Sequence, residues 1–164
     1  MNPYVYFLIA LQLLTVSLID LKTKLISNYW HLVNIVISVG LYIFLSQEYE
    51  LKWELFLLPA GFVLIGFLLF LMGIMGAGDS KYLASLSLLI PAEYHIPFFE
   101  RLLWATMAVG ALLVSFRVLR DFKKISAYIW SRYWQALRDL IKSEFSYAPV
   151  IFLAWLLLGV EIWK

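Results

Sequence analysis

Apolar residues occur in six long runs along this chain, separated by short polar segments. Runs of this kind are typical of membrane-spanning helices, which need about 20 mostly apolar residues. We expect helices at Pro3–Ile19, Tyr29–Ser46, Leu55–Met75, Tyr82–Ala92, Leu102–Phe116 and Tyr147–Val160. The fourth run is short for a full span, so we expect it to extend through the polar residues 93–96 or to begin in a protein-lined region. The pattern predicts an all-α polytopic membrane protein with six transmembrane helices.

The composition agrees with a membrane protein and limits its chemistry. Hydrophobic residues make up 63% of the 164 residues and charged residues only 15%, whereas soluble domains are about half apolar and about a quarter charged. The length suits one compact helical domain over residues 1–164. The chain has no cysteine and only two histidines, on different predicted segments. We therefore expect no disulfide, no metal site and no cofactor. Nothing in the sequence indicates a nucleic-acid partner.

The longest polar stretch is Arg117–Ser146, between the fifth and sixth runs. It carries seven basic residues against three acidic ones. Its apolar positions recur at helical spacing, at Trp130, Trp134, Leu137 and Ile141. This pattern favours an amphipathic helix lying in the membrane interface beside anionic lipids. Two interpretations stay open: a basic loop without a specific partner, or a docking surface for substrate or for components of a pilus or secretion assembly.

The distribution of basic residues predicts the orientation, because they accumulate on the cytoplasmic side. With six spans and the N-terminus outside, ten basic residues fall inside and three fall outside. The inside residues are Lys22, Lys24, Lys81, Arg117, Arg120, Lys123, Lys124, Arg132, Arg138 and Lys142. We expect a multi-pass protein of the cytoplasmic membrane. The same orientation places Asp20 and Asp79 on the cytoplasmic face.

Asp20 and Asp79 are the candidate catalytic residues. Asp20 follows the first apolar run, and Asp79 belongs to the stretch Gly76–Lys81, which interrupts the apolar sequence. Charged groups at membrane depth are costly and usually functional. Gly76 and Gly78 allow a sharp bend and a close approach to the backbone. We interpret the stretch as a turn that holds Asp79 opposite Asp20 in a wet notch.

Two facing carboxylates can hydrolyse a peptide bond without a cofactor. Close carboxylates share a proton, so that one is ionised while the other is protonated. The ionised group acts as a general base on water, and the protonated group polarises the scissile carbonyl. A position at the membrane boundary suits this reaction, because water must reach the site.

Each of these residues also has a simpler interpretation. Asp20 could balance Lys22 and Lys24 at a helix end, and Asp79 could be the N-cap of the fourth helix. The glycines could form an ordinary turn, and Lys81 could be a positively charged anchor on the cytoplasmic side. The remaining polar residues of the apolar runs are expected to form interhelical hydrogen bonds rather than to bind ligands; they are Gln12, His31 and Asn34.

The two motifs together resemble those of the type IV prepilin peptidases, which are membrane aspartic proteases. Gly76-Ala77-Gly78-Asp79-Ser80-Lys81 resembles their GxGD-x-K motif. Asp20, with five residues between it and Ile26-Ser27-Asn28, resembles their first motif, an aspartate with five residues between it and Ile-Pro-Asn. Tyr147-Ala148-Pro149 is a weaker match. The resemblance covers nearly the whole chain and implies that Asp20 and Asp79 are catalytic, with Gly76, Gly78, Lys81 and Asn28 shaping the site.

This resemblance implies an aspartic-type endopeptidase that removes the short basic leader of prepilin-like precursors at the cytoplasmic membrane face. The small size resembles the forms that serve tight-adherence (Flp-type) pili or archaeal preflagellins. Ser27 departs from the family pattern, in which proline is usual, and we expect a looser turn there. Large members also N-methylate the mature pilin and carry a four-cysteine domain. Without cysteine, this chain is not expected to methylate.

Three other functions fit parts of the pattern. A protease of the presenilin or signal-peptide-peptidase type also has a GxGD motif, but its first aspartate lies in a Tyr-Asp pair within a helix, and Ile19 precedes Asp20 here. A small proton- or cation-coupled transporter could use paired intramembrane acids, although no internal repeat is present. A non-catalytic pilus or secretion assembly factor would need neither aspartate.

Overall fold

The computed structural model describes residues 1–50, 52–72, 75–122, 130 and 146–163, and these residues are almost entirely helical. In chain order the α-helices are α1 (Pro3–Thr23), α2 (Asn28–Phe44), α3 (Leu57–Leu71), α4 (Ala77–Ser87), α5 (His95–Arg120) and α8 (Ala148–Ile162). Two short 3₁₀ helices, η1 (Trp53–Phe56) and η2 (Ala92–Tyr94), precede α3 and α5. The described residues contain no strand, so the all-α prediction is confirmed for them.

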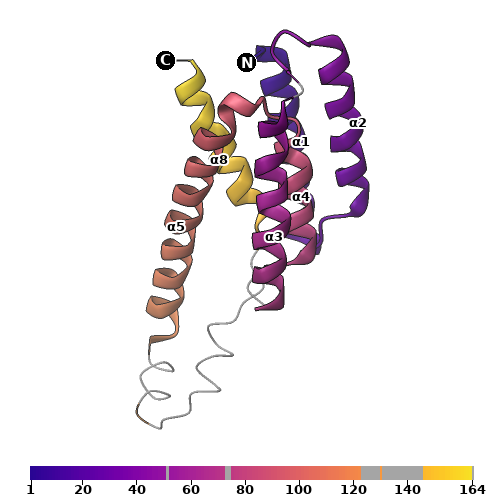
Figure 1. Ribbon diagram of the computed structural model, residues 1–164. Helices are drawn as coiled ribbons and strands as arrows, with labels where there is room; N and C mark the ends of the chain where they lie inside the picture. Colours follow the sequence, from indigo (N-terminus) through magenta and orange to yellow (C-terminus); the bar gives the residue numbers. More distant parts are fainter. Residues whose placement is uncertain (51, 73–74, 123–129, 131–145, 164) are drawn as a thin grey trace.

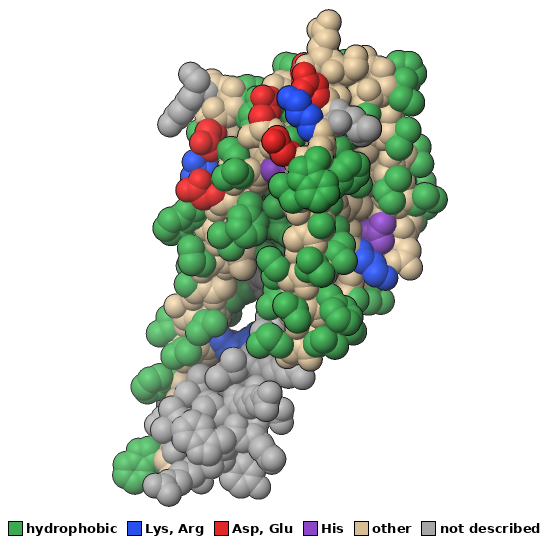
Figure 2. Space-filling view, in the orientation of Figure 1, with side chains coloured by type: hydrophobic (Ala, Val, Ile, Leu, Met, Phe, Trp, Pro, Cys, Tyr) green, Lys and Arg blue, Asp and Glu red, His purple; other side chains and the backbone are tan. Residues whose placement is uncertain are grey.

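Three of these segments are long and apolar enough to cross a membrane. They are Pro3–Thr23, Trp53–Leu71 and Ala92–Arg120, while α2 and α8 are apolar but shorter. Large apolar side chains are exposed along the helices, for example Leu11, Phe44 and Leu112. Charged side chains gather at the end of the molecule that carries both termini, and apolar ones cover the helix sides (Figure 2). This surface is that of a membrane protein, because lipid can cover it where water would not.

The helices form an up-and-down group in which α2 and α3 pack on α4, and α1 and α5 pack on α8. The principal contacts join α3 to α4, α2 to α4, α1 to α8, and α5 to α8. The end of α1 and the beginnings of α4 and α8 all lie at the end of the group opposite the two chain termini (Figure 1). The two predicted motifs therefore share one end of the molecule.

The first and last helices pack closely through aromatic residues. The Tyr6 ring stacks on Trp155 at 5.1 Å, and Tyr6 donates a hydrogen bond to the Trp155 carbonyl at 3.2 Å. Trp155 Nε1 donates in return to the Tyr6 carbonyl at 3.3 Å. Gly159 makes room for the tyrosine, since a Cβ at this position would lie 2.1 Å from Tyr6 Oη. This contact fixes α8 against α1, and thereby fixes the start of α8 beside the end of α1.

Three predicted helix boundaries are wrong, and the first two of them affect the site. The fourth helix was expected from Tyr82 but begins at Ala77, so Asp79 and Lys81 lie in its first turns rather than in a preceding turn. The first helix was expected to end at Ile19 but continues to Thr23, so Asp20 lies in its last turn. The fifth helix begins at His95 rather than Leu102, because Pro97 falls in its first turn, where proline is tolerated. The predicted interfacial helix lies almost wholly outside the described residues.

Candidate functional site

Asp20 is a buried carboxylate held by the beginning of the last helix. Its side chain is 2% exposed, and Oδ2 accepts the Ala148 backbone N–H at 3.1 Å. The Tyr147 backbone amide also donates to it. The first N–H groups of a helix have no partner within the helix, so they can bond to a side chain. The N-terminal end of a helix is partially positive, so this contact stabilises Asp20 as an anion. The simpler interpretation, a carboxylate whose main partners are Lys22 and Lys24, does not account for this burial.

The segment before α8 is fastened to the same place by two further contacts. Ser146 Oγ donates to the Asp20 carbonyl at 3.2 Å. The Tyr147 hydroxyl shares a hydrogen bond with Thr106 Oγ1 of α5, at 2.8 Å. Burial raises the pKa of Tyr147 and the nearby Asp79 charge raises it further, while the Thr106 bond lowers it. Helices α1, α5 and α8 thus meet at Asp20, and Tyr147 brings a hydroxyl group within electrostatic range of Asp79.

Asp79 lies in the first turn of α4, where it closes its own motif. Gly76 is the N-cap of the helix, and Asp79 is three residues beyond it. Asp79 Oδ2 accepts the Gly76 backbone N–H at 3.3 Å. The alternative in which Asp79 is the N-cap of this helix is therefore wrong. Its carboxylate nevertheless accepts a backbone N–H at the helix start. Its second oxygen has no hydrogen bond within the described part of the chain.

Gly78 brings the two motifs into contact. A Cβ at this position would lie 3.4 Å from the Ile26 carbonyl oxygen and 3.8 Å from Ile26 Cβ. The turn after α1 therefore packs directly on the first turn of α4. The charge of Asp20 also acts on Asp79, so the carboxylates lie within electrostatic range of each other. One site thus contains two acidic groups from sequence positions far apart.

The other motif side chains, Asn28 and Lys81, form no hydrogen bond with Asp20 or Asp79 in the described structure. Asn28 is exposed at the first position of α2, and Ser27 is the N-cap of that helix, accepting the Tyr29 N–H at 3.3 Å. Serine in place of the family's proline therefore provides a cap for α2. Lys81 is exposed and lines a hollow of about 100 Å³ between α3 and α4, together with Ala77 and Ser80.

The predicted interhelical hydrogen bonds are confirmed for two residues and wrong for the third. Gln12 Nε2 donates to Asn34 Oδ1, and Asn34 Nδ2 donates to Ser85 Oγ at 3.0 Å. These bonds link α1, α2 and α4. Both ring nitrogens of His31 are buried and have no hydrogen-bond partner in the described structure.

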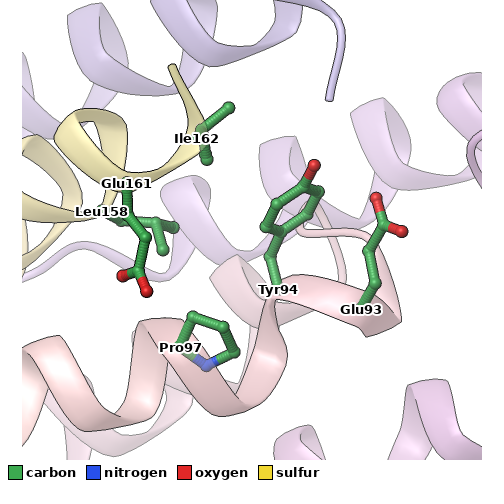
Figure 3. Close-up of a pocket in the computed structure, with 6 residues that line it drawn as sticks. All are labelled: Glu93, Tyr94, Pro97, Leu158, Glu161 and Ile162. Atoms are coloured by element: carbon green, nitrogen blue, oxygen red, sulfur yellow. The ribbon is translucent and has the colours of Figure 1, made fainter. Parts of the chain in front are cut away.

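A different hollow, of about 270 Å³, lies at the opposite end of the molecule between η2, α5 and α8. Its lining includes Glu93, Tyr94 and Glu161, and the two carboxylates lie on either side of the tyrosine (Figure 3). Glu161 forms an ion pair with Arg101 at 2.8 Å. These acids are remote from Asp20 and Asp79. Across the described residues no three His, Cys, Asp or Glu side chains cluster as metal ligands would.

Sequence reasoning missed the backbone of Tyr147 and Ala148 and the side chain of Thr106. An amide group leaves no signature in a sequence. The only signal was the short Tyr147-Ala148-Pro149 segment, where the proline at the second helical position marks a helix start.

Comparison with known proteins gives one match. No curated protein and no solved structure matches the chain. The model of the type IV leader peptidase family matches residues 7–162, which include both aspartate motifs and α8. Because this match covers nearly the whole sequence, the chain belongs to the type IV leader peptidase family.

Proposed function

We propose that this protein is a membrane aspartic endopeptidase that removes the short basic leader from type IV prepilin-like precursors. The observation that carries the proposal is that Asp20, in the last turn of α1, and Asp79, in the first turn of α4, lie at the same end of the helix group, where Gly78 packs on Ile26. Family membership supports a peptidase that acts on pilin-like precursors. The basic residues of the sequence support a location in the cytoplasmic membrane, with the N-terminus outside and the site facing the cytoplasm.

The surroundings of the two carboxylates differ, which suggests different roles. Asp20 accepts amide hydrogens from the start of α8, and an anion is favoured at a helix N-terminus. Asp79 accepts the single Gly76 amide and lies next to the Asp20 charge, which opposes a second negative charge. We therefore assign Asp20 as the ionised general base and Asp79 as the protonated acid.

The reaction follows from these assignments. Asp20 takes a proton from water as the water oxygen attacks the scissile carbonyl carbon, and Asp79 donates its proton to the carbonyl oxygen. Collapse of the tetrahedral intermediate breaks the C–N bond. The proton on Asp20 passes to the leaving amine, and one hydroxyl group of the intermediate returns its proton to Asp79 as the carboxylic acid forms. The exposed backbone at Gly76, beside Asp79, leaves room for an extended substrate strand.

The proposal is tested by cleavage of a co-expressed prepilin, followed as a gel shift. We expect the wild type to cleave, and Asp20→Asn and Asp79→Asn each to abolish cleavage at unchanged membrane expression. Glu93→Gln is the matched control, since it neutralises an exposed carboxylate at the opposite end of the molecule. Full cleavage by either aspartate variant would refute the dyad. A wild type that leaves prepilins of several leader types intact would refute the peptidase assignment.

A further inference from the structure

Three polar side chains beside the aspartates are buried without a hydrogen-bond partner. Ser17 of α1 is 4% exposed and Tyr82 of α4 is 0% exposed. Ser17 Oγ, Tyr82 Oη and both ring nitrogens of His31, on α2, have no partner among the described residues. Buried polar atoms are nearly always satisfied by protein or by ordered water. Three unsatisfied side chains on three neighbouring helices therefore need an explanation.

The three side chains lie at one depth. Ser17 precedes Asp20 by three residues, Tyr82 follows Asp79 by three, and His31 follows the start of α2 by three. Three residues of helix advance about 4.5 Å, so each side chain is just under one turn from the aspartate end. The His31 and Tyr82 rings face each other, with centroids 6.2 Å apart.

The next layer into the membrane is closed by hydrogen bonds. Asn34 and Ser85 follow His31 and Tyr82 by three residues each, and they bond to each other at 3.0 Å. Gln12 joins them from α1 through Asn34. Of the two side-chain amide oxygens in this layer, Asn34 Oδ1 is bonded, and Gln12 Oε1 has no partner in the described structure. His31 and Tyr82 thus lie between this polar layer and the end of the helices that carries the carboxylates.

We propose that His31 and Tyr82 bind buried water between α2 and α4, about one helical turn from the end that carries Asp20 and Asp79. Ser17 lies about 140° around α1 from Gln12, on the side of Tyr6 and α8, and is not part of this site. The tyrosine hydroxyl can donate and accept, and the imidazole offers one donor and one acceptor. A water molecule held by two to four such groups satisfies them without moving a helix. The Gln12–Asn34–Ser85 layer ends the hydrated region toward the membrane centre.

The position gives this water a role in the reaction. An intramembrane protease needs water beside its catalytic carboxylate, even while the bound substrate covers that carboxylate. Water held between α2 and α4, about one helical turn from Asp79, can reach the base while the substrate occupies the open side. This role rests on the proposed function, whereas the water site itself does not.

Radiolytic footprinting tests the water site without any substrate. Hydroxyl radicals generated from bound water oxidise the side chains next to it. We expect Tyr82 to be oxidised despite its burial, and to take up oxygen from H₂¹⁸O more slowly than exposed Tyr29 does. Tyr49 is the matched control, because it is 2% exposed but its hydroxyl is bonded to the Leu89 carbonyl at 3.0 Å. Oxidation of Tyr82 no greater than that of Tyr49 would overturn the proposal.

Substitution of Tyr82 distinguishes a hydroxyl group that binds water from one that does not. If Tyr82 Oη is dry and unsatisfied, Tyr82→Phe removes a buried polar group and raises the melting temperature. If it binds water, the same change leaves the water short of a partner and lowers the melting temperature. We expect the lower melting temperature, with a several-fold fall in kcat and little change in KM. A raised melting temperature would contradict the water site. An oxidised Tyr82 in a protein that cleaves no prepilin would keep the water site and refute only the peptidase function.

Discussion

The spacing of α3 and α4 is predicted to control activity through Gly66. A Cβ at this position would lie 2.2 Å from Ser80 Oγ and 2.3 Å from Ser80 Cβ. Ordinary carbon contacts are 3.5–4.0 Å, so Gly66→Ala must separate the helices by about 1.2–1.7 Å. Ser80 directly follows Asp79, and the displacement therefore reaches the carboxylate.

The expected magnitudes follow from this displacement. Overpacking of this kind costs about 1–3 kcal/mol, of which the better helix propensity of alanine offsets up to about 1 kcal/mol. The effect on the reaction is larger, because a misplacement of about 1 Å can lower a rate by about 100-fold. We therefore expect Gly66→Ala to remain folded, with a slightly lower melting temperature, and to lose about two orders of magnitude in kcat.

The assay compares kcat for prepilin cleavage and the melting temperature across three variants. Gly61→Ala is the control on the same helix, since a Cβ there meets no atom within 4 Å, and we expect wild-type activity from it. In Gly66→Ala/Ser80→Gly the clashing side-chain atoms are removed, which leaves Ser80 Cα, at 3.3 Å, as the nearest recorded atom. We expect this variant to recover part of the rate. Wild-type cleavage by Gly66→Ala alone would show that the α3–α4 contact does not position Asp79.

Three further results are expected. Lys81→Ala should reduce cleavage far less than loss of either aspartate, because Lys81 is exposed and lies outside the carboxylate contacts; inactivation as complete as that of the aspartate variants would make Lys81 part of the reaction. Cleavage should persist in excess EDTA, since two carboxylates activate water without a metal, and a loss that added Mg²⁺ or Zn²⁺ restores would refute the mechanism. Gly159→Ala should lower the melting temperature by several degrees, because its Cβ would overlap the Tyr6 ring. Gly110→Ala is the control and should leave the melting temperature unchanged, because a Cβ there meets no atom within 4 Å. Equal melting temperatures for the two variants would contradict the close α1–α8 packing.

Much of this arrangement could be predicted from the sequence, because membrane helices and acidic residues leave strong signals. Apolar runs located the six α-helices of the described residues, and the two motifs gave Asp20 and Asp79 as the candidate residues. The start of α4 was missed because Gly76-Ala77-Gly78 has the low helix propensity of a turn. Packing of Ser80 on Gly66 and the bond from Asp79 to the Gly76 amide favour the helix instead. Neither of these two interactions can be read from the local sequence pattern.

The partners of the site residues were the least predictable part. Burial of Asp20 depends on an amide of Ala148, and a backbone group is the same in every sequence. His31 was expected to form a hydrogen bond because histidine in an apolar helix usually finds a partner. Whether one is present depends on how α2 packs against α4, and the structure leaves both ring nitrogens unsatisfied.

The bond between Asp20 and Ala148 joins residues 128 positions apart. During synthesis α1 enters the membrane long before the ribosome has made α8. Until α8 inserts, Asp20 lacks the amides that hold it, and its carboxylate is exposed to whatever lies beside α1. The nascent chain therefore passes through the membrane without a finished site. The proposed proteolytic activity therefore requires the last helix to dock on α1, and a chain that ends before α8 is expected to be inactive.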